Sequence, residues 1–583
     1  MKLRIITFLC LVVTFFYGCS SGRYVTLDEL QRGTTKRDIT CVITKPWDLK
    51  RKTVLLPKNS TLIFKNGGCI KNGTLVGNST MIKCENPFIG EKVTIKKCRI
   101  IGQGVIRDKD VYLTVKHTQN EIQTLFDIGG GAKLVFSNGN YQNVEKIEIS
   151  NNVEADFCSS TINLKYDKEH VGECFYMEPW VNKHIEYVKI KNLTINGKRD
   201  GIKGTVARRC IQLFYVSEVE LDNIAIDKFY AGPQEYKDDS SDLLNKTRIG
   251  TSSINIIYYD KCVINNCKTN DISNEIFWCV PNNNPHNITY FTNNKSTCSK
   301  ANGSSSFFTI LDGRCVVKCN EVHNYNGSAF NVLCYDSEIS DNTFYDGKRS
   351  VAIDLSEGTM YRAKNVNIHD NYCYNTKGMV AAFGEGIRIH HNHWSNDDVQ
   401  DGKRIYICYI KTRGKRIKDG KYVGCNNNPE KGVGSKSIII ENNECINKGG
   451  VKGEEIRFAC LYGDNISVTQ NSIRGLNVPV VQLAKGNDFK YENNIIKASK
   501  EGRYAELVIN QGKNIKVTNN FFSRVYTNKK TNYIVQLLAP EGQLTCKGNR
   551  LGNNINGNKY IIVPCYIENS SKLRESDIQI YSE

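Results

Sequence analysis

Four charged residues within one short stretch, Lys348, Arg349, Asp354 and Glu357, could do chemistry on an acidic sugar. β-Elimination at a uronic acid unit requires a cation that neutralises the sugar carboxylate and a base that removes the neighbouring proton. Lysine, arginine or a bound Ca²⁺ can do the first task, and lysine, arginine or histidine the second. We therefore predict Lys348, Arg349 and Asp354 as catalytic residues, with a set of ordinary surface ion pairs as the alternative interpretation.

A column of polar residues is predicted beside these charges. In a strand whose side chains alternate, one outward residue lies between each pair of inward ones. On successive early repeats the outward residues are Gln212, Asn255, Thr309, Asn331 and Asp354, and on later repeats they are Ala459, Gln482, Val508 and Leu537. A polar row with steps of about 4.8 Å suits successive sugar hydroxyls. We predict that the four uncharged early residues bind substrate together with Arg208 and Glu357, and that Lys485, on a late repeat, is dispensable; an ordinary solvated strand face is the alternative.

The strands that would carry this column are indicated by a repeated phrase. An apolar residue, two variable residues, Asn, one variable residue and a bulky apolar residue recur around Asn342, Asn371, Asn392 and Asn443. The first two steps, of 29 and 21 residues, are too short for a helical hairpin repeat and suit one turn of a β-solenoid. Asn tolerates the left-handed backbone of a sharp turn, and stacked Asn side chains can form hydrogen-bonded ladders. These residues are therefore predicted to stack at one corner of successive coils.

Upstream of each Asn, another strand ends in a tight turn such as Asp312-Gly313 or Glu541-Gly542. The order of strand, tight turn, strand, Asn turn and short strand resembles the right-handed parallel β-helix of the pectin-lyase-like superfamily, as found in repeat lipoproteins of the Bacteroides type. The resemblance covers most of residues 117–570. It implies an all-β, single-stranded solenoid with a short capping helix, for which Thr118 to Phe126 has the amphipathic pattern and the Thr cap. Such scaffolds host lyases, hydrolases and inert binders, so the fold alone does not fix the reaction.

Two patterns support other interpretations. The segments Asn396-Asp397-Asp398 and Arg416-Ile417-Lys418 are similar to short motifs of the polygalacturonase hydrolases, in which paired carboxylates activate water and protonate the leaving oxygen. Here the spacing is compressed and the intervening His-Gly motif is missing. His369 and His390 share one repeat position and could bind a metal. No third ligand joins them in register, so we prefer a polar outer strand and predict no metal site.

The N-terminal segment is predicted to direct export. Lys2 and Arg4 precede an apolar run from Ile5 to Tyr17 that is too short to span a bilayer as a mature helix. Cys19 follows and resembles the lipidated first residue of a bacterial lipoprotein. We predict a signal peptide at residues 1–18, a lipidated tether at 19–50, a small β-rich module at 51–112 and the β-helix at 113–583. A lipid anchor at Cys19 would hold the protein in the cell envelope, at the outer membrane.

The net charge indicates which molecules the protein could bind, and the cysteine positions indicate where its thiols lie. The 583 residues include 78 Lys and Arg against 60 Asp and Glu, a net charge of +18. This excess favours a polyanionic partner, which could be an acidic polysaccharide, nucleic acid or an anionic membrane. We expect an acidic polysaccharide, a monomer, no nucleic acid partner and no established cofactor, with Ca²⁺ as the one candidate. Several of the 23 cysteines, such as Cys373, Cys445 and Cys460, occupy inward positions and are predicted to be buried, unpaired thiols. The sequence predicts a polysaccharide lyase, with a glycoside hydrolase or a non-catalytic carbohydrate-binding or adhesive surface protein as alternatives.

Overall fold

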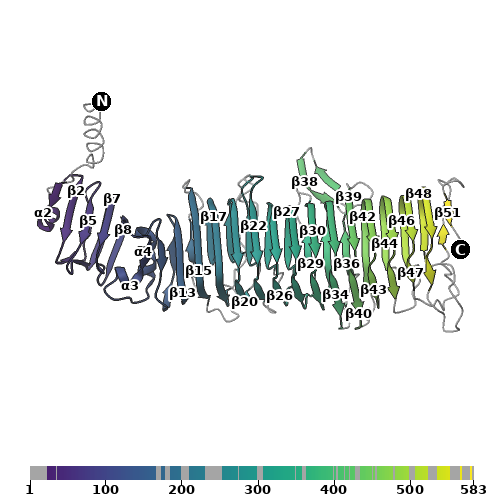
Figure 1. Ribbon diagram of the computed structural model, residues 1–583, viewed down its shortest axis with the longest axis horizontal. Helices are drawn as coiled ribbons and strands as arrows, with labels where there is room; N and C mark the ends of the chain where they lie inside the picture. The colour runs from purple at the N-terminus through teal and green to yellow at the C-terminus, as the bar shows by residue number, and fades with distance from the viewer. Residues whose placement is uncertain are drawn as a thin grey trace, which may run out of the picture. The chain divides into compact units, whose positions relative to one another are not determined.

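The computed structural model describes residues 23–33, 36–165, 173–177, 184–197, 209–229, 252–272, 275–298, 306–347, 350–356, 363–397, 400–401, 405–411, 414–418, 421–426, 434–449, 451–452, 456–476, 480–497, 506–522, 535–551, 565–567 and 578–580. Its contacts divide the chain into two compact units, which are described separately (Figure 1). Unit 1 comprises Met1–Asn163, Phe175–Met177 and Tyr187–Leu193, and unit 2 comprises Leu164–Cys174, Glu178–Glu186 and Thr194–Glu583. The domain boundaries placed near residues 18, 50 and 112 remain predictions.

Unit 1 begins with a stack of short parallel strands. Its first sheet follows the order β1 (Arg23–Val25), β2 (Ile39–Ile43), β5 (Thr61–Phe64), β7 (Gly73–Cys84) and β4 (Thr53–Leu55), with β8 (Val93–Ile100) added to β7. β3 (Pro46–Asp48) pairs with β6 (Cys69–Lys71), and the short helices α2 (Leu27–Gln31) and α3 (Asp108–Val111) accompany these strands. All of these strand pairings are parallel, and alternate residues of β2 are buried, which gives the unit its core.

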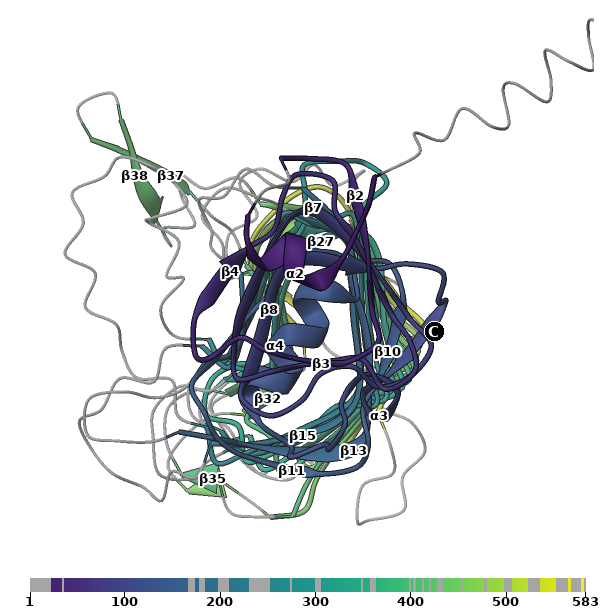
Figure 2. The same cartoon turned by 90° about the vertical axis from the view of Figure 1, so that its left-hand side faces the viewer.

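The predicted capping helix is present in unit 1 as α4 (Gln119–Ile128). Thr118 accepts a hydrogen bond from the backbone N–H of Glu121, and the Glu121 carboxylate accepts one from the backbone N–H of Thr118, which together form a capping box. Asn120 donates to the Val93 carbonyl at 2.8 Å, so the helix lies against β8 (Figure 2). Its apolar face is buried and covers the neighbouring strands of the unit.

Of the remaining strands of the N-terminal region, the first precedes α3 and α4 in the sequence and the others follow α4. They are β9 (Val105–Arg107), β10 (Lys133–Val135), β11 (Asn140–Val144) and β12 (Lys146–Glu148). β13 (Val153–Leu164), β14 (Glu173–Tyr176) and β15 (Ile185–Asn196) contribute residues to both units.

Unit 2 is built from coils of three strands, and the described strands pair in parallel with their counterparts in the neighbouring coils. The first strands are β16 (Ile211–Phe214), β18 (Ile254–Ile257), β21 (Phe277–Val280), β24 (Phe308–Gly313), β29 (Val351–Leu355), β32 (Gly378–Ala382), β36 (Ile405–Ile410) and β50 (Cys565–Ile567). The second strands are β19 (Lys261–Asn265), β22 (Ile288–Thr292), β25 (Cys315–Lys318), β30 (Ala363–His369), β33 (Gly384–His390), β39 (Ser435–Glu441) and β51 (Ile578–Ile580).

The third strands of the coils are shorter. They are β20 (Lys268–Ile272), β23 (Lys295–Cys298), β26 (Glu321–His323), β28 (Thr343–Tyr345), β31 (Tyr372–Tyr374), β34 (His393–Asn396), β40 (Glu444–Asn447), β43 (Ser472–Arg474), β45 (Ile495–Lys497), β47 (Phe521–Phe522) and β49 (Arg550–Leu551). β17 (Val216–Asp227) runs through the second and third positions of its coil. Five strands run through the first and second positions: β27 (Phe330–Ser340), β42 (Ile456–Thr469), β44 (Val481–Glu492), β46 (Leu507–Thr518) and β48 (Val535–Lys547).

Stacking of like apolar residues holds successive coils together. Ile387 and Ile389 of β33 are fully buried and pair in register with Ile438 and Ile440 of β39, one coil further along. Full burial of one such side chain contributes about 1.5–3 kcal/mol, and each coil adds several. The prediction of a mostly β chain with few helices is confirmed for the described residues, because the period-two pattern recurs in strand after strand.

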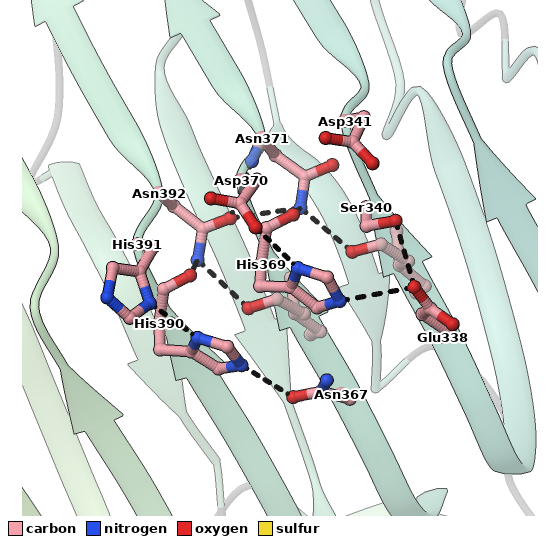
Figure 3. A network of polar contacts seen from close by, with 12 residues as sticks. Glu338, Ser340, Asp341, Asn367, His369, Asp370, Asn371, His390, His391 and Asn392 are labelled. Atoms are coloured by element: carbon pink, nitrogen blue, oxygen red, sulfur yellow. Dashed lines mark hydrogen bonds and ion pairs between the residues drawn. The ribbon is translucent and has the colours of Figure 1, made fainter.

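The predicted Asn stack is confirmed, although the turn geometry differs from the prediction. Asn342, Asn371, Asn392 and Asn443 are buried and linked in that order by side-chain hydrogen bonds of 2.9–3.0 Å. Figure 3 shows the link between Asn371 and Asn392. The left-handed residue is the one before each Asn, such as Asp370 with a φ of 54°. The preceding residue makes the bend, which leaves the Asn free to direct both its backbone and its side-chain amide at the next coil.

Cys373, Cys445 and Cys460 are buried and form no disulfide, as predicted. Burial raises the pKa of the Cys373 and Cys445 thiols well above the ordinary value, so both remain protonated at neutral pH. Cys373 and Cys445 lie in line on the third strands, separated by Trp394. These thiols act as small apolar side chains of the core.

Two features concern the surface and the membrane. The long insertion after Arg413 contains an antiparallel pair, β37 (Gly414–Lys418) and β38 (Lys421–Asn426), which stands away from the coils of unit 2 in Figure 2. A further short pair joins β35 (Gln400–Asp401) to β41 (Val451–Lys452). Among the described residues, no helix has the length and apolar character needed to cross a membrane. Cys19 and the apolar run before it lie outside the described residues.

Candidate active site

The column predicted from strand alternation exists along the first strands of the coils. Its residues, in order along the stack, are Gln212, Asn255, Trp278, Thr309, Asn331, Asp354, Ala381, Tyr409, Cys460, Gln482, Val508 and Gln536. The five early residues expected in it are all there. Trp278, Ala381 and Tyr409 belong to coils that the sequence analysis passed over.

Two of the later positions were predicted wrongly by one residue. Cys460 and Gln536 occupy the column, whereas Ala459 and Leu537 are fully buried on the inward face. Cys460 lies three residues before the turn glycine Gly463, whereas Gln482 lies four residues before Gly486, so a constant count fails at β42. In β48 the residue aligned with the turn glycine Gly512 is Pro540, four residues after Gln536, so a count that starts at Glu541-Gly542 misses the column.

The column is buried, which contradicts the prediction of an open polar row. The exposed fractions are 0% for Asn255, 3% for Thr309, 4% for Gln212, 6% for Asp354 and 7% for Asn331. Three of them hydrogen-bond to nearby side chains: Arg209 donates to Gln212, the Ser252 hydroxyl donates to Asn255, and Asn331 donates to Ser306 at 2.9 Å. Alternation determines the face that a side chain takes but not what covers that face. The substrate-binding roles of these residues remain predictions.

Three successive coils of the column carry buried polar atoms with unmade hydrogen bonds. Within the described structure, Nε1 of Trp278, Oγ1 of Thr309 and Oδ1 of Asn331 have no partner. Backbone pairing places these residues next to one another along the stack. An unsatisfied buried polar group costs about 1–3 kcal/mol, so such groups are rare in folded proteins. The predicted roles of Thr309 and Asn331 in binding stay predictions.

Asp354 is the centre of a charged cluster at the next coil. Its Oδ1 accepts hydrogen bonds from the backbone N–H of Ser356, at 2.7 Å, and from the Ser356 hydroxyl. Lys411, which directly follows β36, places its Nζ 3.7 Å from Oδ2 of Asp354 and donates to Oγ of Ser356 at 2.6 Å. The Lys411 side chain is 25% exposed and that of Asp354 is 8% exposed, so the cation is the more accessible partner.

Aromatic side chains continue the cluster on the far side of Lys411. Its Nζ lies 5.5 Å from the centre of the Tyr409 ring, and Tyr409 stacks on Tyr406 with ring centres 5.0 Å apart. Arg457, buried on the next coil, lies 6.0 Å from the centre of the Tyr406 ring and donates to Gln482. Burial, reinforced by Cys460, Tyr462 and Tyr406, raises the pKa of Tyr409 to about 12. The Tyr409 phenol is therefore protonated at neutral pH.

Small residues separate the acidic side of this cluster from the aromatic side. In the coil between Asp354 and Tyr409, the column residue is Ala381. The backbone N–H of Lys411 donates to the carbonyl of Ala382 at 2.8 Å, which holds the start of the lysine side chain against this coil. From there the side chain crosses the intervening coil and reaches Ser356 and Asp354. The cluster thus unites an ammonium, a carboxylate and a neutral phenol on one face.

The structure tests only part of the predicted site. Asp354 is placed in the cluster, whereas Arg208, Lys348, Arg349 and Glu357 lie outside the described residues. The sequence analysis missed Lys411, Tyr409, Tyr406 and Arg457. β36 is followed in the sequence by the long insertion, so no tight turn comes directly after it from which its alternation could be counted. The alternating run from Ile405 to Ile410 was the available signal for a first strand at that position.

The hydrolase-like segments do not form a carboxylate pair in the described structure. Asn396 is buried and its amide donates to Asn447 at 2.9 Å, as part of a structural turn. Asp397 lies 3.4 Å from Lys448 and accepts a hydrogen bond from Tyr374. Asp398 lies outside the described residues, as do the side chains of Arg416 and Lys418.

The histidines of the repeat are engaged with one another and with their neighbours (Figure 3). His369 and His390 stack with ring centres 4.9 Å apart. Their nitrogens contact Glu338 at 3.2 Å, Asp370 at 2.7 Å, Asn367 at 2.8 Å and His391 at 2.7 Å. Over the described part of the chain, no group of three or more His, Cys, Asp or Glu side chains could hold a metal ion. The contacts favour the polar outer strand over a metal site.

No protein-family model matches the chain, and no curated protein matches its sequence. Among solved structures, a PL6 alginate lyase in complex with a trisaccharide is similar, with 13% identity and a TM-score of 0.39 over 68% of this chain and 86% of that chain. An alginate lyase in complex with G6 has 13% identity and a TM-score of 0.40 over 79% and 91% of the two chains. The catalytic domain of a GH87 α-1,3-glucanase has 9% identity and a TM-score of 0.16 over 95% and 69%. Similarity at this level carries no argument about activity.

Proposed function

We propose that unit 2 is a right-handed, single-stranded parallel β-helix that cleaves acidic polysaccharide by β-elimination at uronic acid units. The reaction is assigned to Asp354, Tyr409 and Lys411. The observation that carries this assignment is the partly exposed Lys411 ammonium, held by a buried carboxylate beside a protonated phenol. The basic character of the chain, with a net charge of +18, supports an acidic substrate.

Each residue of the cluster has a distinct role in this proposal. Lys411 neutralises the uronate carboxylate, which acidifies the proton on the adjacent carbon. Asp354 and Ser356 fix the position of the Lys411 ammonium, so Asp354 is a positioning residue. Tyr409, kept protonated by its raised pKa, donates a proton to the departing glycosidic oxygen. Lys348 and Arg349, which directly precede β29 in the sequence, remain the predicted source of the base.

The composition of the cluster favours a lyase over a hydrolase. A glycoside hydrolase flanks the scissile bond with two carboxylic groups, about 5–9.5 Å apart. Among its described residues, the cluster holds one carboxylate, Asp354, together with a cation and a phenol. The described carboxylate of the hydrolase-like segment, Asp397, lies in an ion pair with Lys448. No step is assigned to Ca²⁺, because the described residues do not form a site for it.

The deciding experiment measures the product. Purified protein is incubated with a panel of polyuronates, and the ultraviolet absorbance of the unsaturated sugar is followed. Lys411→Ala should abolish the signal, whereas Lys318→Ala should leave it unchanged. Lys318 is a matched control because its Nζ lies 3.3 Å from a carboxylate, Asp341, on the corner between second and third strands. New reducing ends without the absorbance would identify a hydrolase, and binding without either product would identify a non-catalytic binder.

We also propose that the mature protein is held in the cell envelope through lipid on Cys19. The basic start, the short apolar run and the cysteine that follows support this location. A lipid anchor would place the lyase where polysaccharide from outside the cell arrives.

A further inference from the structure

A cavity of about 400 Å³ lies on the late coils of unit 2 and begins at Gly434, on the coil that carries Lys411. Its floor is a row of glycines, Gly434, Gly463, Gly486 and Gly512. One wall consists of Tyr462, Lys485, Gln511 and Ala539, and the other consists of Asp464, Asn487, Lys513 and Glu541. These residues lie at the bend between the first and second halves of β42, β44, β46 and β48. We call this feature the glycine trough.

Close approach of the coils requires the glycines. A Cβ at Gly463 would lie 2.1 Å from the carbonyl oxygen of Ser435, and one at Gly486 would lie 2.0 Å from that of Gly463. Gly463 also has a φ of +143°, which residues other than glycine rarely adopt. The consequence for function is a floor made of backbone alone, flanked on both sides by longer side chains. A ligand can therefore approach the backbone over several coils.

The residues of each wall occupy the same position on successive coils. Backbone pairing aligns Asn487 with Lys513 and Lys513 with Glu541 on one side, and Gln511 with Ala539 on the other. Each step along the trough therefore advances by one strand spacing, about 4.8 Å. That step is close to the length that one pyranose unit adds to an extended chain. A linear polysaccharide lying along the trough would present one sugar unit to each coil.

Two lysines and two carboxylates line the trough: Lys485, Lys513, Asp464 and Glu541. Asp464 accepts hydrogen bonds from the backbone N–H of Asn487 at 3.0 Å and from its side-chain amide at 2.8 Å, and these neutral donors leave its charge in place. Lys485 and Lys513 are exposed, face the trough from opposite walls, and form no ion pair with any described residue. Two unpaired ammonium groups on neighbouring coils are suited to carboxylates on successive sugar units.

A peptide strand fits the trough poorly. The strands that form the floor already use their backbone groups in parallel pairing with the coils before and after them. An extended peptide therefore finds no free sheet edge to join, and it would have to bind through side chains alone. A saccharide needs no such edge, because its hydroxyls and carboxylates bond to side chains.

We propose that the glycine trough binds an extended acidic oligosaccharide lengthwise, as an anchoring site distinct from the Asp354–Lys411 cluster. The choice of an acidic sugar rests on the proposed function, while the existence of a site rests on the trough itself. Lys485, predicted from the sequence to be dispensable, is then one of its two principal contacts. The trough would hold long substrate chains on the protein between successive cleavages.

The test compares two double variants in the full chain. Lys485→Ala with Lys513→Ala removes both trough cations. Lys490→Ala with Lys516→Ala removes two exposed lysines that are paired in register on the same strands but do not line the cavity. Binding of labelled oligouronates, and of a neutral oligosaccharide of equal length, is measured at low salt by fluorescence anisotropy. The trough variant should lose oligouronate affinity by at least about tenfold, and the control variant should keep it within about twofold.

The outcomes separate the two proposals. Lys411→Ala should abolish cleavage while keeping oligouronate binding, and the trough variant should lose binding while still cleaving short oligouronates. If the trough variant binds as the unaltered protein does, or if the control loses as much affinity, the anchoring site is refuted whatever the lyase assay shows. If the trough variant alone loses binding but no polyuronate is ever cleaved, the anchoring site stands and the lyase assignment fails.

Discussion

The side-chain amide of Asn371 donates to Oδ1 of Asn392 at 2.9 Å, and the backbone N–H of Asn371 donates to the same oxygen at 3.0 Å. Asn392 repeats both contacts on Asn443 at 3.0 Å. Its amide also donates to the carbonyl of Ile368 on the previous coil. Asn392 thus donates to both neighbouring coils and accepts from the previous one, which couples its coil to both neighbours.

This coupling makes Asn392 sensitive to conservative change. Asn392→Ala should lower the free energy of unfolding by about 2–3 kcal/mol, because it leaves the amide of Asn371 and backbone groups of two coils unpaired. Asn392→Asp should be at least as damaging, since a carboxylate accepts but cannot donate and would be buried with its charge. Urea unfolding followed by circular dichroism measures both. Asn270→Ala, at an exposed amide on Asp227, is the control and should change stability by less than about 0.5 kcal/mol.

Asp354 and Lys411 should contribute to catalysis jointly, because they form one ion pair at the proposed active site. Lys411→Ala and Asp354→Asn should each lower kcat/KM for a polyuronate by at least about tenfold, the equivalent of about 1.4 kcal/mol. The double variant should lose little more than the worse single variant, because Asp354 acts through Lys411. Steady-state kinetics of the four proteins form the test. Fully additive losses would show that Asp354 contributes independently of Lys411.

Tyr409 should make stability fall at alkaline pH. Its pKa is raised from 10 to about 12 in the folded protein, so the folded state keeps a proton that the unfolded chain releases. The resulting stabilisation is fully present below pH 10 and is lost as the pH rises toward 12. Tyr409→Phe should flatten the decline in unfolding temperature over this window and should also reduce cleavage. An unchanged alkaline profile would show that the phenol does not differ between the two states.

Asp127 of α4 should lower the stability of the folded protein already at neutral pH. Burial raises its pKa from 3.8 to about 6, although Gln123 donates a hydrogen bond to it. The folded state therefore favours the protonated acid, so its stabilising contribution is present below pH 3.8 and is lost as the pH rises through 6. Asp127→Asn should stabilise the protein by about 1 kcal/mol at pH 7, a figure reduced for partial exposure, and by almost nothing at pH 4. Thermal unfolding at the two pH values provides the comparison.

Cys19→Ser should release the protein from the membrane fraction. The proposed lipid is attached through the cysteine sulfur, which serine cannot supply, so metabolic labelling with a fatty acid should disappear at the same time. Cys158→Ser is the matched control, because Cys158 is an exposed free thiol in unit 1 and should leave both readouts unchanged. Retention of Cys19→Ser at the membrane would show that another contact holds the protein there.

The sequence was sufficient to predict the repeating elements. The Asn phrase predicted the ladder through Asn371 and Asn392, because a turn every coil imposes the same backbone geometry and the same amide contacts each time. The pattern from Thr118 to Phe126 predicted α4, since a capping box and an apolar face are local properties. The early column from Gln212 to Asp354 followed from strand alternation, which is also local.

Only the tertiary structure decided that this column is buried and which side chains from other coils contact it. Gln212 and Asn255 are buried beside Arg209 and Ser252, which donate hydrogen bonds to them, and a count along one strand contains no such information. Lys411 reaches Ser356 from 55 residues away in the sequence, across the intervening coil of β32. Stacking of the coils brings β29 and β36 to within two strand spacings of each other, and no pattern along either strand alone contains that contact.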